Sequence, residues 1–154
     1  MTDAKGRCRC VVSACLAGES CRYDGASNLR PEIAGLVAAG LAVTVCPEVL
    51  GGLPTPRIPS EIRCGSVINA EGDDVTHAFV QGAEEALRIA RKYGCTTAIL
   101  KARSPSCGCG YVYDGSFTRT LAQGDGIFAA MLRAEGLDLL TEEDITPATL
   151  QALK

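Results

Sequence analysis

Short runs of β-branched and aliphatic residues alternate along this chain with longer segments in which apolar residues recur at helical spacing. This alternation is typical of a parallel sheet whose strands are joined by right-handed crossovers. We therefore expect a single-domain α/β fold over residues 1–154, Rossmann-like, with an open, mostly parallel sheet and helices on both faces. The expected strands are 10–14, 41–45, 65–69, 95–101 and 137–140.

Helical periodicity is clearest where one face is apolar and the opposite face is charged. Asn28 is placed to cap the first helix, and Gly40 to end it. Between the second and third strands, prolines and a Gly51-Gly52 pair block regular structure, so we predict an ordered loop over 46–63. Loops of that length in a compact domain are usually functional or disordered. The expected helices are 29–39, 76–93, 127–135 and a short C-terminal tail over 141–154.

Composition narrows the range of partners and compartments. The net charge of -3 does not favour long DNA or RNA, because a protein that grips a polyanion usually carries a basic surplus. No apolar run approaches the roughly 18 residues of a membrane helix, and residues 1–7 lack the apolar core of a signal peptide. We expect a cytoplasmic protein with a small-molecule ligand.

Nine cysteines in 154 residues is a high and odd number, which does not suit a secreted disulfide scaffold. Four of them lie in or beside predicted strands and are interpreted as small buried residues. These are Cys8, Cys10, Cys64 and Cys95. The others lie on loops rich in glycine, proline and serine, and they are Cys15, Cys21, Cys46, Cys107 and Cys109.

Three of the loop cysteines follow directly on predicted strands, namely Cys15, Cys46 and Cys107. The carboxyl ends of neighbouring parallel strands share one crevice, so these thiols are expected to meet there and to form a soft-metal or cluster site. The single histidine, His77, falls early in a predicted helix and is expected to face solvent. Thiolates without imidazole suit an iron–sulfur cluster or, less well, zinc.

Candidate proton-transfer groups stand beside these cysteines. Glu48 follows Cys46 by two residues and is either a general base or a carboxylate that caps a helix or pairs with an arginine. Ser104 and Ser106 precede Cys107, and their hydroxyls either position a water or substrate or belong to an ordinary Ser-Pro turn.

A second group of side chains is suited to a heterocyclic ligand. Arg22, Tyr23 and Asp24 supply a planar cation, an aromatic face and a carboxylate, which either bind a heterocycle or form an ion pair that closes the loop. Arg57 on the long loop is a similar case. The chain lacks both G-x-x-x-x-G-K-[ST] and a G-x-G-x-x-G after the first strand, which disfavours a nucleotide cofactor.

Taken together, the motifs resemble the thiouracil desulfidase family, formerly a domain of unknown function, in its single-domain form. The resemblance covers nearly the whole chain. It rests on Ser13-Ala14-Cys15-Leu16, Cys21-Arg22-Tyr23-Asp24-Gly25, Cys46-Pro47-Glu48, Gly51-Gly52-Leu53, Pro56-Arg57 and the stretch from Lys101 to Gly108.

The resemblance implies a [4Fe–4S] cluster held by Cys15, Cys46 and Cys107, with one iron free of protein ligands and with Cys21 as the alternative to Cys15. It also implies that Glu48 and Ser104 are catalytic. From their side-chain chemistry, the residues expected to bind the substrate are Arg22, Tyr23, Asp24, Arg57 and Ser106.

The implied reaction is a non-redox, hydrolytic desulfuration of a thiolated pyrimidine base or nucleoside to uracil and hydrosulfide. The free iron polarises the C–S bond as a Lewis acid, and Glu48 deprotonates a water that Ser104 orients. The extra cysteine at position 109 departs from the family pattern. Two alternatives stay open, a cluster- or metal-binding module without catalysis and a thiol redox protein that uses Cys15 and Cys21.

Overall fold

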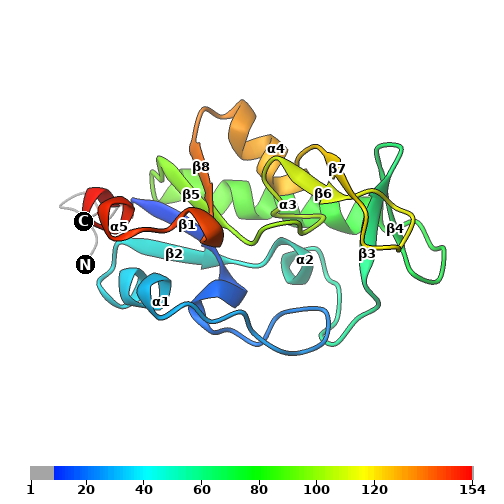
Figure 1. The fold of residues 1–154 in the computed structure, drawn as a ribbon, viewed down its shortest axis with the longest axis horizontal. Helices are drawn as coiled ribbons and strands as arrows, with labels where there is room; N and C mark the ends of the chain where they lie inside the picture. The colour runs from blue at the N-terminus through cyan, green and yellow to red at the C-terminus, as the bar shows by residue number, and fades with distance from the viewer. Residues whose placement is uncertain (1–8, 154) are drawn as a thin grey trace.

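The central sheet of the computed structural model, which describes residues 9–153, has four strands in the order β2–β1–β5–β8 (Figure 1). Every neighbouring pair in the sheet is parallel. The strands are β1 Cys10–Ser13, β2 Ala42–Val45, β5 Thr97–Leu100 and β8 Asp138–Thr141. The two central strands, β1 and β5, are buried along their whole length, which accounts for their nearly continuous apolar sequences.

Two helices cover one face of the sheet, α3 Thr76–Lys92 and α4 Ile127–Ala134. The apolar face of α3 presents small residues such as Ala83 and Ala86 to the sheet, so this long helix packs closely against it. Phe128 of α4 is fully buried in the same cluster.

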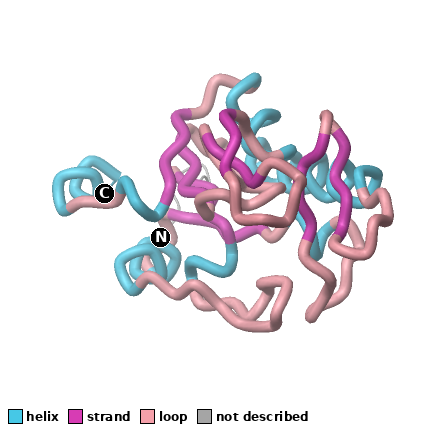
Figure 2. The backbone as a smooth tube through the Cα atoms, turned by 45° about the vertical axis from the view of Figure 1, so that its right-hand side comes forward, coloured by secondary structure: helices cyan, strands magenta, loops and turns pink. Residues whose placement is uncertain are grey.

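The opposite face is covered by α1 Pro31–Ala38 and α5 Pro147–Leu153, together with the short 3-10 helix η1 Ala14–Ala17. Ile33 and Leu36 of α1 are buried there against the sheet. Figure 2 shows helices on either side of the central strands. The predicted α/β fold with an open parallel sheet and helices on both faces is therefore confirmed.

Two antiparallel hairpins lie at the end of the molecule away from α5 (Figure 1). The first joins β3 Ser60–Arg63 to β4 Ser66–Asn69, and the second joins β6 Tyr111–Tyr113 to β7 Leu121–Gln123. The strand predicted at 65–69 exists, but it pairs within its own hairpin. The predicted loop over 46–63 also contains β3 and a one-turn helix, α2 Pro47–Leu50.

Some local predictions are wrong. The first helix starts at Pro31 and not at 29, because a residue before proline is disfavoured in the helical region, and Arg30 is accordingly extended. Asn28 therefore does not cap this helix, whose N-cap residue is Arg30. Cys64, expected to be buried, is exposed in the turn between β3 and β4.

The other structural expectations have mixed outcomes. Cys10 is fully buried as expected, Cys95 is partly buried, and His77 is exposed as expected. Cys8 lies outside the described residues. The C-terminal tail is helical in α5, which the short 3-10 helix η2 Glu142–Asp144 precedes. Across residues 9–153 the helices are too short or too polar to span a bilayer.

Candidate functional site

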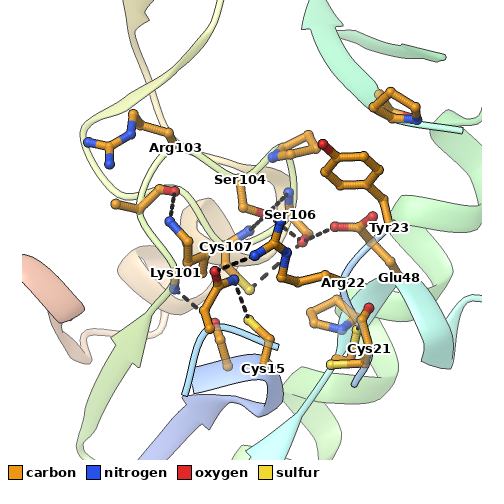
Figure 3. A pocket seen from close by; sticks show the side chains of 18 of the residues that line it. Cys15, Cys21, Arg22, Tyr23, Glu48, Lys101, Arg103, Ser104, Ser106 and Cys107 are labelled. Atoms are coloured by element: carbon orange, nitrogen blue, oxygen red, sulfur yellow. Dashed lines mark hydrogen bonds between the residues drawn. The ribbon is translucent and has the colours of Figure 1, made fainter. Parts of the chain in front are cut away.

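A cavity of about 470 Å³ opens at the carboxyl ends of the central strands (Figure 3). Cys15 follows β1, Cys46 follows β2, and Cys107 lies in the loop after β5. Since these three strands are neighbours in the sheet, the topology brings the three thiols together, as the sequence predicts. The other site candidates that line the cavity are Cys21, Arg22, Tyr23, Glu48, Arg57, Ser104 and Ser106.

Cys21 lies between two of the strand-end cysteines. Its thiol hydrogen-bonds to the thiols of both Cys15 and Cys46. These hydrogen bonds are the largest of the effects that lower the pKa of Cys15 and of Cys46 to about 7, and the pKa of Cys21 itself is raised by the same contacts. The amide of Asn28 also lowers the pKa of Cys15, with its Nδ2 3.5 Å from the sulfur. Because Cys21 carries one S–H proton, it donates to one of these two thiols at a time, and that neighbour is favoured as a thiolate near neutral pH.

Cys107 occupies a different environment. It is almost fully buried, and this burial raises its pKa, with smaller upward contributions from Cys15 and Cys46. Ser106 Oγ lies 3.8 Å from its sulfur, and Ser13 also hydrogen-bonds to it. A buried thiol of this kind ionises fully only when a cation binds it.

The donor set suits a cluster better than a single metal ion. Within residues 9–153, no three His, Cys, Asp or Glu side chains converge closely enough to hold one ion. The cysteine ligands of an iron–sulfur cluster can lie farther apart than the ligands of a single ion, because each cysteine binds a different iron at a different corner. Thiols at three strand ends around an open cavity fit that requirement, with Cys21 as an additional thiol at the same wall.

A chain of hydrogen bonds runs along the cavity from Ser104 to Glu48. Ser106 Oγ donates to Glu48 Oε2 at 2.9 Å and lies 3.0 Å from Ser104 Oγ. Because the Ser106 proton points at the carboxylate, Ser104 is the donor in the second bond. Ser104 Oγ in turn accepts the backbone N–H groups of Ser106 and Cys107. The hydroxyl of Ser104 is therefore polarised towards Glu48.

Arg57 holds the other oxygen of the carboxylate. Its Nε lies 3.0 Å from Glu48 Oε1, and its terminal nitrogens bond to the carbonyls of Cys21 and Pro54 and to the Thr55 hydroxyl. The Arg57 side chain is only 6% exposed. These bonds use most of its donors on protein atoms, so Arg57 positions Glu48 and the Cys21 loop, and its expected contact with the substrate stays a prediction.

The short helix α2 fixes both Cys46 and Glu48. Cys46 is its N-cap, Pro47 begins it, and Glu48 stands in its first turn. The helix packs on α3 so closely that a Cβ at Gly82 would lie 1.7 Å from the carbonyl oxygen of Pro47. Contact between the backbones of α2 and α3 thus sets the position of the carboxylate.

The loop after Cys21 is closed by an ion pair. Arg22 bonds to Asp24 at 2.7 Å and to Asn28 at 3.0 Å. Asp24 lies outside the cavity lining and closes the loop through Arg22, and its expected contact with the substrate stays a prediction. Arg22 and the half-exposed ring of Tyr23 do line the cavity.

Other cavity residues had no assigned role in the sequence. Lys101 follows β5 directly, the same signal that identified the cysteines, and its Nζ lies 3.6 Å from buried Glu142. Asn28 was expected to cap the first helix. Because that helix starts only at Pro31, the Asn28 amide is free to contact the Cys15 sulfur, a role that the sequence did not predict. Cys109, by contrast, does not line the cavity and contacts Arg133 at 3.4 Å.

Comparisons with known proteins agree on one family. The family model described as 2-thiouracil desulfurase matches residues 10–144. The "Uncharacterized protein YbbK" of Bacillus subtilis (strain 168) is 38% identical over 145 residues, which cover 88% of this chain and 96% of that protein. The solved structure of the [4Fe-4S]-dependent thiouracil desulfidase TudS is 42% identical and superimposes with a TM-score of 0.87, covering 96% of this chain and 98% of the other.

Proposed function

The chain belongs to the 2-thiouracil desulfurase family, and on that premise we propose that it is a [4Fe–4S]-dependent enzyme that converts a thiolated pyrimidine into uracil and hydrosulfide. The family membership confirms the resemblance seen in the motifs. The observation that carries the chemistry is the chain of hydrogen bonds from Ser104 through Ser106 to Glu48, at the same cavity as the strand-end thiols.

Cys15, Cys46 and Cys107 are the proposed ligands of the cluster. When bound, a cluster with one iron free of protein ligands supplies a Lewis acid with high affinity for sulfur, which makes hydrosulfide a better leaving group. The low pKa of Cys15 and Cys46 favours their thiolate forms before loading. Cys21 remains the alternative ligand to Cys15, because its thiol contacts the same neighbours.

Proton transfer is assigned to the protein. We assign Glu48 as the general base, and Ser106 as the relay that connects it to Ser104. A water beside Ser104 attacks the ring carbon that carries the sulfur, and its proton reaches Glu48 Oε2 through the two hydroxyls. Arg57 keeps Glu48 in place by holding Oε1. Ser106, expected to bind the substrate, is 2% exposed and is better placed for this relay.

The substrate is proposed to be a free thiolated base or nucleoside, such as 2- or 4-thiouracil. A cavity of about 470 Å³ lies within the range of small-molecule sites. Tyr23 offers an aromatic face at the cavity wall, and Arg22 offers hydrogen-bond donors. The net charge of -3 agrees with a small ligand in preference to long RNA. A cytoplasmic location belongs to the same proposal.

The decisive experiment combines iron content with turnover. Protein prepared without oxygen is expected to hold about four irons per chain and to convert 4-thiouracil, followed by loss of substrate absorbance and release of sulfide. E48Q and S106A are expected to keep their iron and to lose about 10²–10⁴ in kcat, the usual contribution of a general base. C107S is expected to lose iron.

Matched controls are E71Q and S116A, which change an exposed glutamate and an exposed serine outside the cavity. Wild-type protein without iron would exclude the cluster. Full activity in both E48Q and S106A would exclude the proton relay. If C15S assembles a normal cluster and C21S does not, Cys21 takes the place of Cys15 as ligand.

A further inference from the structure

Cys21 and Cys46 stand in a wall between two cavities. The cavity described above lies on one side, and a second, smaller cavity of about 220 Å³ lies on the other. Only a few residues line both cavities, and these are Ala14, Cys21, Val45 and Cys46. Cys15 and Cys107 line the first cavity alone. The pair Cys21 and Cys46 is therefore reachable from the second cavity as well as from the first.

The second cavity is suited to small uncharged molecules. Apart from Glu19 and Thr44 its side chains are apolar or thiol-bearing, and they include Val49, Leu50 and Ile89. Val49 and Leu50 of α2 are about two-fifths exposed at its edge. A cavity of this size and polarity admits a small neutral molecule such as hydrogen peroxide.

The two sulfurs that meet at the wall are already in contact. The Cys21 thiol hydrogen-bonds to the Cys46 thiol, and Cys46 Sγ also lies 3.9 Å from the Cys21 carbonyl oxygen. Cys15 also interacts with Cys21, but the Asn28 amide nitrogen lies 3.5 Å from the Cys15 sulfur and engages it as well. Cys46 is thus the partner with access to both Cys21 and the second cavity.

We infer that Cys21 is a redox-active cysteine that forms a disulfide with Cys46 when a small peroxide reaches the cluster-free protein through the second cavity. One thiolate of the pair attacks the peroxide, which breaks the O–O bond and gives a sulfenic acid and water. The other sulfur then attacks the sulfenic sulfur, forms the S–S bond and releases a second water. Two thiols and one hydrogen peroxide thus become one disulfide and two waters.

The consequence concerns loading of the cluster. A disulfide removes Cys46 from the set of ligands reversibly, whereas a Cys46 left alone with peroxide proceeds to sulfinic acid, which thiols do not reduce. Cys21 therefore protects a cluster ligand while the cluster is absent. The disulfide does not depend on the proposed reaction, and only this consequence depends on Cys46 being a ligand.

The test uses the full chain, freed of iron by a chelator under reducing conditions. Hydrogen peroxide is added in slight excess, the remaining thiols are blocked with N-ethylmaleimide, and the peptides are mapped by mass spectrometry. The expected product links Cys21 to Cys46, with loss of about two thiols per chain. A map without this link, or with Cys15 joined to Cys21 in its place, overturns the proposal. Because the mapping uses the wild-type chain, it does not depend on a variant that folds.

Reloading the protein with iron distinguishes protection of Cys46 by Cys21 from oxidation of the thiols without protection. After peroxide and then dithiothreitol, the wild type is expected to regain its iron. C21A, measured against its own iron content before peroxide, is expected to lose iron binding permanently through oxidation of Cys46. C64S, which changes an exposed turn cysteine, serves as control and is expected to behave like the wild type. Equal recovery by C21A and the wild type would refute protection, whether or not the protein desulfurates thiouracil.

The route through the second cavity has its own variant. L50W fills the edge of that cavity and is expected to slow formation of the disulfide severalfold. L121W, which places the same side chain at an exposed strand position outside the lining of both cavities, is expected to have no effect. Oxidation of L50W at the wild-type rate would show that peroxide arrives by another path.

Discussion

Replacement of Gly82 by alanine tests how the position of the proposed base is set. Gly82 is in the interior of α3, where alanine is favoured over glycine by about 0.8–1.0 kcal/mol. The added Cβ, however, would lie 1.7 Å from the Pro47 carbonyl oxygen and 2.8 Å from the Gly51 amide nitrogen. Helix propensity and packing therefore predict opposite signs for the same substitution.

Packing is expected to prevail at this position. Ordinary contact begins at 3.4 Å, so α2 and α3 must separate by roughly 1.7 Å. The atoms in the way are backbone atoms, and no side-chain rotation relieves them. Overpacking of a well-packed contact costs about 1–3 kcal/mol, so after the gain in propensity we expect a net loss of up to about 2 kcal/mol. For a domain of this size that lowers Tm by up to about 8 °C.

The matched control is Gly35, which also lies inside a helix but has no atom within 4 Å of its Cβ position. G35A is expected to raise the free energy of unfolding by about 0.8–1.0 kcal/mol. Urea unfolding and thermal melting of both variants measure the difference. If G82A proves as stable as G35A, the close contact between α2 and α3 does not constrain the protein, and our account of how Glu48 is held is wrong.

Two further predictions concern ionisation and burial. In the cluster-free chain, alkylation by iodoacetamide, followed peptide by peptide, should lose rate as pH falls through about 7 at Cys15 and Cys46, because their pKa values are lowered to about 7 and only the thiolate reacts. Cys107 should react only at higher pH, since burial raises its pKa, and an equal pH profile at all three thiols would contradict the assigned environments. E142A should lower the free energy of unfolding in urea by about 1–3 kcal/mol, because it leaves the buried N–H of Ala102 without its acceptor at 2.8 Å. E143A, at an exposed position in an ion pair with Arg103, is its control, and an equal effect of the two would contradict this role for Glu142.

The sequence was informative wherever one local rule governed the outcome. The apolar runs located all four strands of the central sheet, and parallel topology then placed Cys15, Cys46 and Cys107 at one edge. The strand-end rule needs no knowledge of loop conformation, because the end of each strand fixes the start of the loop. The same rule, applied to Lys101, would have added it to the cavity.

The sequence did not predict the contacts that depend on loop conformation. Ser106 reaches Glu48 across 58 residues of sequence, and only the folded turn around Ser104 aims its hydroxyl at the carboxylate. Arg57 looked like a ligand for a heterocycle, yet its loop folds back on Glu48. The helix start at Pro31 was a different kind of error, because the restriction that proline places on the residue before it was readable from the sequence.

The placement of Cys46 and Glu48 on one short helix couples two properties of the proposed site. Cys46 is the N-cap of α2 and Glu48 lies in its first turn, so a movement of α2 displaces a proposed cluster ligand and the proposed base together. E48Q changes the base without moving the helix, whereas G82A moves the helix without changing either residue. Iron content should therefore fall in G82A and stay constant in E48Q, while turnover falls in both. That pattern is expected only if the position of α2, and not the identity of its side chains alone, joins cluster binding to proton transfer.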